Sequence, residues 1–133
     1  MRFMLLVLPK NYDQAAPNQM PDRQQVELMM KYNQALKDAG VLVELNGLYP
    51  PSAGVRVSYK NRQPRVIHPP YPEAKESIGG YWIIQVKSKG EAVQWASEIP
   101  FLGEETVEVR QIHEMSDFPP EVQEAGKKLM DGK

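Results

Sequence analysis

The chain has 133 residues, of which 41% are hydrophobic and 25% are charged, a balance typical of one globular domain. It contains no cysteine, which excludes a disulfide framework, a cysteine nucleophile and a cysteine-ligated metal. Its 16 Lys and Arg and 17 Asp and Glu give a net charge of -1, so a broad basic surface for nucleic acid is not expected. The longest apolar run, residues 3–8, is too short for a bilayer span or a signal-peptide core, so we expect a soluble cytoplasmic protein.

Apolar periodicity and turn residues predict the secondary structure. In chain order we expect a strand at 3–8, a helix at 22–39, a strand at 41–45, a hairpin at 55–59 and 65–67, an irregular connector at 68–80, a strand at 81–86, a helix at 91–99, a strand at 106–112 and a short amphipathic segment near 122–129. Asp22 is placed to cap the first helix and Gly40 to end it. Ser88 and Glu91 form a capping box for the second helix, and Pro100 ends it.

This order of elements predicts an α+β fold, the ferredoxin-like βαββαβ sandwich, with an extra hairpin and a C-terminal helix. We divide the chain into a domain at 1–115 and a helical tail at 116–133. In such a sandwich both helices cover one face of the sheet. The other face would carry apolar rows from strands 3–8 and 81–86, more exposed apolar surface than a monomer usually tolerates. Two copies that pack sheet to sheet would cover it; a tail folded back over it is the alternative.

Residues 66–82 read VIHPPYPEAKESIGGYW. This segment resembles the signature of YCII-related proteins of the DGPF type, roughly D-G-P-F-x-E-x-K-E followed by a glycine and an aromatic-rich strand. Further similarity at residues 1–4, 39–42 and 85–110 extends the resemblance over most of the chain. The resemblance implies a dimeric α+β barrel of ferredoxin-like protomers with a cleft between the sheets. It implies no particular reaction, since some relatives look like small lyases or dehalogenases and others accompany sigma factors.

The chain also departs from the family pattern. His68 and Pro69 stand where the motif usually has Asp-Gly, and Tyr71 replaces its Phe. Asn46 stands where many relatives have Glu. Broader YCII proteins carry a histidine in the first helix that pairs with an aspartate, and here Met29 or a neighbour occupies that position. Any function that needs this histidine–aspartate pair is therefore in doubt.

The connector carries the residues to which we assign acid–base chemistry. His68 and Glu73 are the candidate catalytic residues, because histidine transfers protons near neutral pH and a carboxylate close in sequence can partner it. In the structural alternative, His68 only hydrogen-bonds the loop backbone. Glu76 and Lys75 complete a polar cluster in which Lys75 would hold an anionic ligand, or in which the carboxylates cap backbone N–H groups instead.

Cationic and aromatic side chains of the sheet are the other candidates. Arg110, with Arg2 or Arg56, could present guanidinium groups to a carboxylate ligand, or could form ion pairs with Glu108 or Glu44. The tyrosine–tryptophan pair at 81–82 has two interpretations. Its rings could form aromatic walls for a ligand, or they could serve ordinary core and interface packing. The predicted ligand-binding residues are Arg2, Asn46, Tyr71, Lys75, Glu76, Tyr81, Trp82 and Arg110.

No metal or cofactor is expected. His113 has acidic neighbours but no third ligand for a metal, and phosphate-loop, dinucleotide and serine-elbow motifs are absent from the sequence. Three function classes remain. The first is a cofactor-free lyase or isomerase that binds a small anionic or aromatic molecule in the cleft between two sheets. The second is a non-catalytic ligand sensor or protein-interaction module in a regulatory setting. RNA binding, the third, is disfavoured because Glu108 accompanies Arg110 on the last strand.

Overall fold

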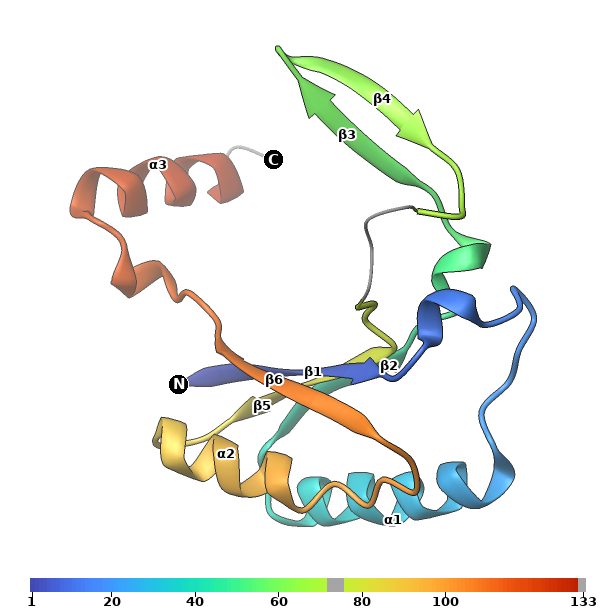
Figure 1. Cartoon of the computed structure of the whole chain (residues 1–133). Coiled ribbons are helices and arrows are strands. Elements are labelled where there is room, and N and C mark those ends of the chain that lie inside the picture. Colours follow the sequence, from blue (N-terminus) through green and yellow to red (C-terminus); the bar gives the residue numbers. More distant parts are fainter. Residues whose placement is uncertain (72–75, 132–133) are drawn as a thin grey trace.

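The computed structural model describes residues 1–71 and 76–131 (Figure 1). Its elements are β1 (Arg2–Pro9), η1 (Tyr12–Gln14), α1 (Arg23–Asp38), β2 (Leu42–Gly47), η2 (Pro51–Ala53), β3 (Arg56–Lys60), β4 (Gln63–Ile67), β5 (Gly80–Gln85), α2 (Lys89–Ser97), β6 (Glu105–Gln111), η3 (Met115–Asp117) and α3 (Pro120–Asp131). The predicted α+β class is confirmed, with a four-stranded sheet and a separate two-stranded one.

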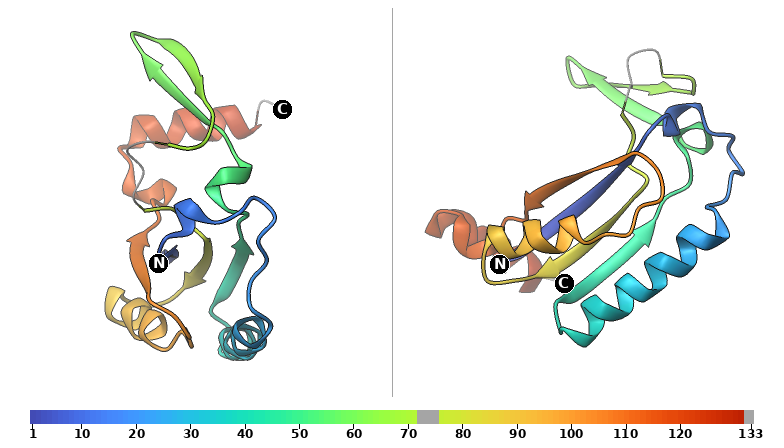
Figure 2. Two further views of the ribbon diagram at one scale, coloured as in Figure 1. Left: turned by 45° about the vertical axis from the view of Figure 1, so that its right-hand side comes forward. Right: turned by 60° about the horizontal axis from the view of Figure 1, so that its bottom comes forward.

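The main sheet has the strand order β2-β5-β1-β6, and every neighbouring pair is antiparallel. This is the order that two β-α-β halves produce in a ferredoxin-like sandwich. Figures 1 and 2 show α1 and α2 side by side under one face of the sheet. We call the opposite face, which no helix covers, the open face.

The core lies between the helices and the sheet because side chains alternate along each strand. Phe3 pairs with Ile84 and Leu5 pairs with Trp82, so all four point to the same side. They are buried against Leu36 of α1 and against α2. Met4, Leu6 and Ile83 point to the open face and are only partly buried. The expected apolar rows on this face are therefore present.

The predicted helix signals are confirmed. The Asp22 carboxylate accepts a hydrogen bond from the Gln25 N–H at 3.2 Å, and Gly40 adopts a φ of 73° after α1. The Ser88 hydroxyl accepts a hydrogen bond from the Glu91 N–H at 3.1 Å. The Glu91 carboxylate reaches back to the Lys87 N–H at 2.9 Å, which is one residue before the expected partner.

The hairpin is present, but its turn is shorter than the predicted one at 60–64. Asn61 and Arg62 both have positive φ, 51° and 66°, and form the two-residue turn that suits the twist of the strands. Lys60 and Gln63 therefore pair with each other as strand residues. The hairpin and α3 both extend on the side of the open face, at opposite ends of the sheet, and α3 stands off the sheet (Figure 1). The alternative of a tail folded over this face is thus not what the structure shows.

Candidate functional site

Three polar side chains meet on the open face where β2 borders β5. The Tyr81 hydroxyl donates to the Glu44 carboxylate at 3.2 Å and accepts from the Asn46 amide at 2.9 Å. Asn46 and Tyr81 face each other across the two strands, and Leu6 is the next residue along the same row. Of the predicted ligand-binding residues, Asn46 and Tyr81 are thus brought together. They adjoin the apolar rows of the open face.

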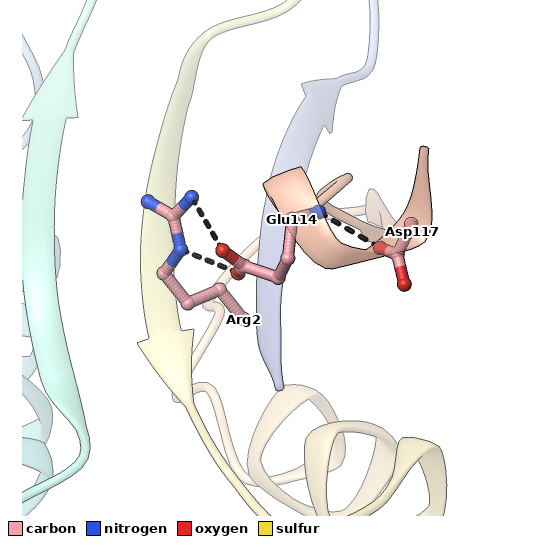
Figure 3. Close-up of polar contacts among 3 residues, drawn as sticks. All are labelled: Arg2, Glu114 and Asp117. Carbon is pink, nitrogen blue, oxygen red and sulfur yellow. Dashed lines mark hydrogen bonds and ion pairs between the residues drawn. The ribbon is translucent and has the colours of Figure 1, made fainter. Parts of the chain in front are cut away.

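The two arginines expected to bind an anion are paired with carboxylates of the chain itself. Arg2 donates to both carboxylate oxygens of Glu114, at 2.7 and 3.3 Å, and Asp117 in turn accepts from the Glu114 N–H at 2.8 Å (Figure 3). Hydrogen bonding to Arg2 lowers the pKa of Glu114 below its ordinary value. Arg110 lies on the neighbouring strand β6, opposite Met4, and donates to Glu108 at 3.1 Å. This arrangement matches the ion-pair alternative, since a ligand carboxylate would have to displace Glu114 or Glu108.

The connector residues are dispersed. His68 is exposed where β4 ends. Tyr71 lies under the Arg56 guanidinium, with 4.3 Å between the Arg56 carbon and the ring centroid. Glu73 and Lys75 fall outside the described residues. Glu76 reaches the far end of the sheet, where it lines a small cavity described below.

Trp82 is placed by the structure in the core and not on the open face. Its side chain is 6% exposed, and its indole N–H donates to the Asn33 side chain at 2.7 Å. The Tyr32 ring meets it edge to face at a centroid distance of 5.4 Å. Trp82 therefore follows the core-packing alternative, because its partner across the sheet is Leu5, whose side chain points toward the helices.

A hollow lies where β1 ends, and sequence reasoning did not single it out. This end cavity has a volume of about 770 Å³, within the range of small-molecule sites. The segment at 9–22, the first turns of α1 and the segment at 101–105 enclose it. Its apolar lining includes Val7, Met20, Met29, Phe101 and Leu102.

Hydrogen bonds between distant segments fix the walls of the end cavity. The chain leaves β1 at Pro9 and turns through Asn11, whose φ is 60°. The Tyr12 hydroxyl then donates to the Leu48 carbonyl at 2.6 Å, and partial burial raises the pKa of Tyr12. The Gln25 amide ties α1 to the opposite wall, because it donates to the Pro100 carbonyl and accepts from the Leu102 N–H, each at 2.8 Å.

Glu105 is a carboxyl in the lining of the end cavity, and burial removes part of its solvent. Its Oε2 is buried and has no hydrogen-bond partner among the described residues. Desolvation, with a smaller contribution from the neighbouring charge of Glu104, raises the pKa of Glu105. Glu105 also lines a second cavity of about 330 Å³, together with Glu76 and Lys10. Its carboxyl thus stands between two hollows, and Lys10 is held by Glu104 at 2.6 Å.

A signal for Glu105 exists in the sequence. Glu105 has the same strand parity as Val107 and Val109, which pack against the core. A carboxyl in phase with core-facing residues is unusual, because an unpaired buried charge is costly. Tyr12 and Gln25 carry no such signal, since their role depends on partners distant in the sequence.

Comparison with known proteins adds a family. A family model described as the YCII-related domain matches residues 1–116. A search of curated proteins found no match. Within the described residues, no helix is long and apolar enough to cross a membrane. Over the same residues, no group of three or more His, Asp or Glu side chains is arranged to hold a metal ion.

Proposed function

The chain belongs to the YCII-related family, and we propose that it binds a small organic molecule in the end cavity, with Glu105 as the polar group that the ligand meets. One observation carries this proposal: a carboxyl oxygen is buried at the wall of a cavity of ligand size and has no hydrogen-bond partner in the described part of the chain. A buried polar atom without a hydrogen bond is costly, and a ligand that donates one would remove that cost.

The lining defines the class of ligand. Side chains such as Met20, Met29 and Phe101 would cover an aromatic or aliphatic body. Glu105 would accept a hydrogen bond from a hydroxyl or amine group on that body. We therefore propose an apolar molecule with one donor group, which keeps the expected aromatic character of the ligand.

The same carboxyl supports acid–base chemistry. Desolvation brings the pKa of Glu105 closer to neutrality than that of an exposed glutamate, and a carboxyl in this state can both take and return a proton. A cofactor-free isomerisation or elimination that needs one proton carrier is the reaction class that fits. In the non-catalytic alternative, the ligand binds in the same place and leaves unchanged.

A second candidate site is the cleft that would form between the open faces of two copies. The hydrogen-bonded group of Tyr81, Asn46 and Glu44 favours it, because a polar group beside apolar rows is what such a cleft would offer a ligand. His68 and Arg110 would act in this cleft as the proposed proton carrier and anion contact. The homodimer on which this candidate depends is part of the proposal.

The experiment compares Glu105→Gln with Glu104→Gln in a thermal-shift screen against benzylamine, benzyl alcohol and their ring-substituted forms. Both variants lose one carboxyl, but of the two residues only Glu105 lines the end cavity with a buried carboxyl oxygen. We expect a hit to raise the Tm of the wild type and of Glu104→Gln and to lose its effect on Glu105→Gln. A ligand present at a hundredfold its Kd stabilises the folded state by about 2.7 kcal/mol.

Equal stabilisation of both variants would place the ligand elsewhere and refute the role of Glu105. In that case Tyr81→Phe tests the second candidate, because it removes the hydroxyl and keeps the ring. Product formation, followed for each hit by chromatography, separates an enzyme from a binding module.

A further inference from the structure

The β3–β4 hairpin has one apolar face that stays exposed among the residues that the structure describes. Val57 pairs with Val66 and Tyr59 pairs with Pro64, so these four side chains share a face. Val57 is 50%, Val66 56% and Tyr59 70% exposed. A two-stranded hairpin that packs on nothing is marginal in water, so this face needs a cover.

The C-terminal helix α3 has the same property. Val122, Leu129 and Met130 are 44%, 75% and 68% exposed. Together with Ala125 they follow the helical spacing of an apolar stripe. A short helix owes most of its stability to the packing of such a stripe, so α3 also needs a partner surface.

The two elements carry opposite charge. Residues 55–67 contain Arg56, Lys60, Arg62 and Arg65 and no acidic residue. Residues 114–130 contain Glu114, Asp117, Glu121 and Glu124 against Lys127 and Lys128. Arg56, Lys60 and Arg65 lie on the face of the hairpin opposite Val57 and Val66. Their charge would therefore attract the helix segment at a distance, and two hairpins or two helix segments would repel each other.

The hairpin and α3 lie at opposite ends of the sheet, so they do not pack on each other within one chain. This placement suits a dimer with a two-fold axis. α3 follows the end of the sheet where Phe3 pairs with Gln111, and the hairpin leaves from the end where Gly47 pairs with Gly80. Both extend beyond the open face (Figure 1). If the open faces of two copies meet, a two-fold axis can lie between the sheets, perpendicular to their strands. This axis places the sheet end that carries α3 in one copy over the sheet end that carries the hairpin in the other.

We propose that the hairpin of each copy packs its apolar face on α3 of a second copy, so that two reciprocal contacts clasp a homodimer. The inference rests on the dimer included in the proposed function, and it adds which elements hold the two copies together. The partner is another copy of this chain because the two uncovered surfaces complement each other in polarity and charge. In an isologous dimer the apolar faces of both hairpins and of both α3 helices are covered at once.

Single-cysteine variants test the contact directly, since the natural chain has no cysteine. Val66→Cys and Leu129→Cys chains are purified separately, mixed, equilibrated and oxidised. We expect a disulfide-linked heterodimer on a non-reducing gel that neither variant forms alone. Val66→Cys mixed with Gln94→Cys is the matched control, because Gln94 is exposed on α2, on the opposite side of the sheet. A cross-link no stronger than this control would overturn the proposal.

Charge reversal gives a second readout. Arg65 lies opposite Ser58 on the other face of the hairpin, so Arg65→Glu tests the attraction between the two oppositely charged elements and should raise the dimer Kd about threefold. An unchanged Kd contradicts the proposed attraction between the hairpin and the helix segment. Arg65 is exposed, so folding, checked by circular dichroism, should be unaffected.

Sedimentation of the wild-type chain separates this inference from the ligand proposal. A dimer without the hairpin-to-helix cross-link overturns the clasp alone. A monomer at 50 µM overturns both the clasp and the cleft between two sheets, but it leaves the end cavity untouched because that cavity lies within one chain. Binding of the hairpin to RNA or to anionic vesicles in place of α3 would also contradict the clasp.

Discussion

Gly79→Ala should destabilise the protein by deforming the wall of the end cavity. A Cβ at this position would lie 2.6 Å from Pro9 Cγ and 2.9 Å from Pro9 Cδ, with Tyr12 Cε2 at 3.6 Å. To reach an ordinary contact of 3.4 Å, the proline ring must move by roughly 0.8 Å. Pro9 is stiff because its ring is part of the backbone at the end of β1.

Gly79 cannot move away from Pro9 to relieve the clash. Its N–H donates to the Val7 carbonyl at 2.8 Å, and its carbonyl accepts from the Leu48 N–H at 2.9 Å. We therefore expect the free energy of unfolding to fall by about 1–3 kcal/mol, the usual cost of overpacking. Because Pro9 and Tyr12 line the end cavity, ligands found in the screen should also bind more weakly.

Urea denaturation measures this change, and Gly90→Ala is the matched control. A Cβ on Gly90 would meet only Ser88 Oγ at 3.8 Å, so alanine should be neutral there or stabilising by about 0.5–1 kcal/mol. If both variants were equally stable, the close packing of Gly79 on Pro9 would be refuted, and with it our account of how this wall is held.

Two further predictions concern stability. Tyr32→Phe should cost about 1–2 kcal/mol in urea denaturation because the Trp95 carbonyl loses a buried donor at 2.7 Å; it should also protect against unfolding above pH 10, where the raised pKa of Tyr32 penalises the folded state. The lowered pKa of Glu114 means that its bond to Arg2 stabilises the folded state above pH 4.5 and is lost as the pH falls through the folded-state value. Hydrogen exchange should accordingly show the segment after β6 loosening in acid, and an acid dependence that persists in Glu114→Gln would contradict the role of this pair.

The fold could be predicted because its signals are local. Alternation along β1 and β5, the cap at Asp22 and the left-handed Gly40 each depend on residues within one element. The turn of the hairpin was predicted too long because Asn61 and Arg62 adopt two consecutive positive φ angles. Asn favours a positive φ, but Arg does not, so the residue types at these two positions did not predict a two-residue turn.

The site was harder to predict because it depends on contacts between distant segments. Tyr12 meets Leu48, and Gln25 meets the loop that follows α2. Periodicity does not reveal such pairs. The prediction for Arg2 included an ion-pair alternative but not its partner, Glu114, which lies at the other end of the family domain.

The position of Met29 links the family pattern to the end cavity. The resemblance to YCII-related proteins implies that Met29 or a neighbour stands where broader relatives carry a histidine in the first helix, and Met29 lines the end cavity. A thioether cannot transfer a proton, so the wall formed by α1 lacks a titratable group at this point. Glu105 presents one from β6, on the opposite wall. Glu105 Oε2 has no hydrogen-bonded base among the described residues, which favours a single proton transfer or simple binding over chemistry that needs two coupled groups.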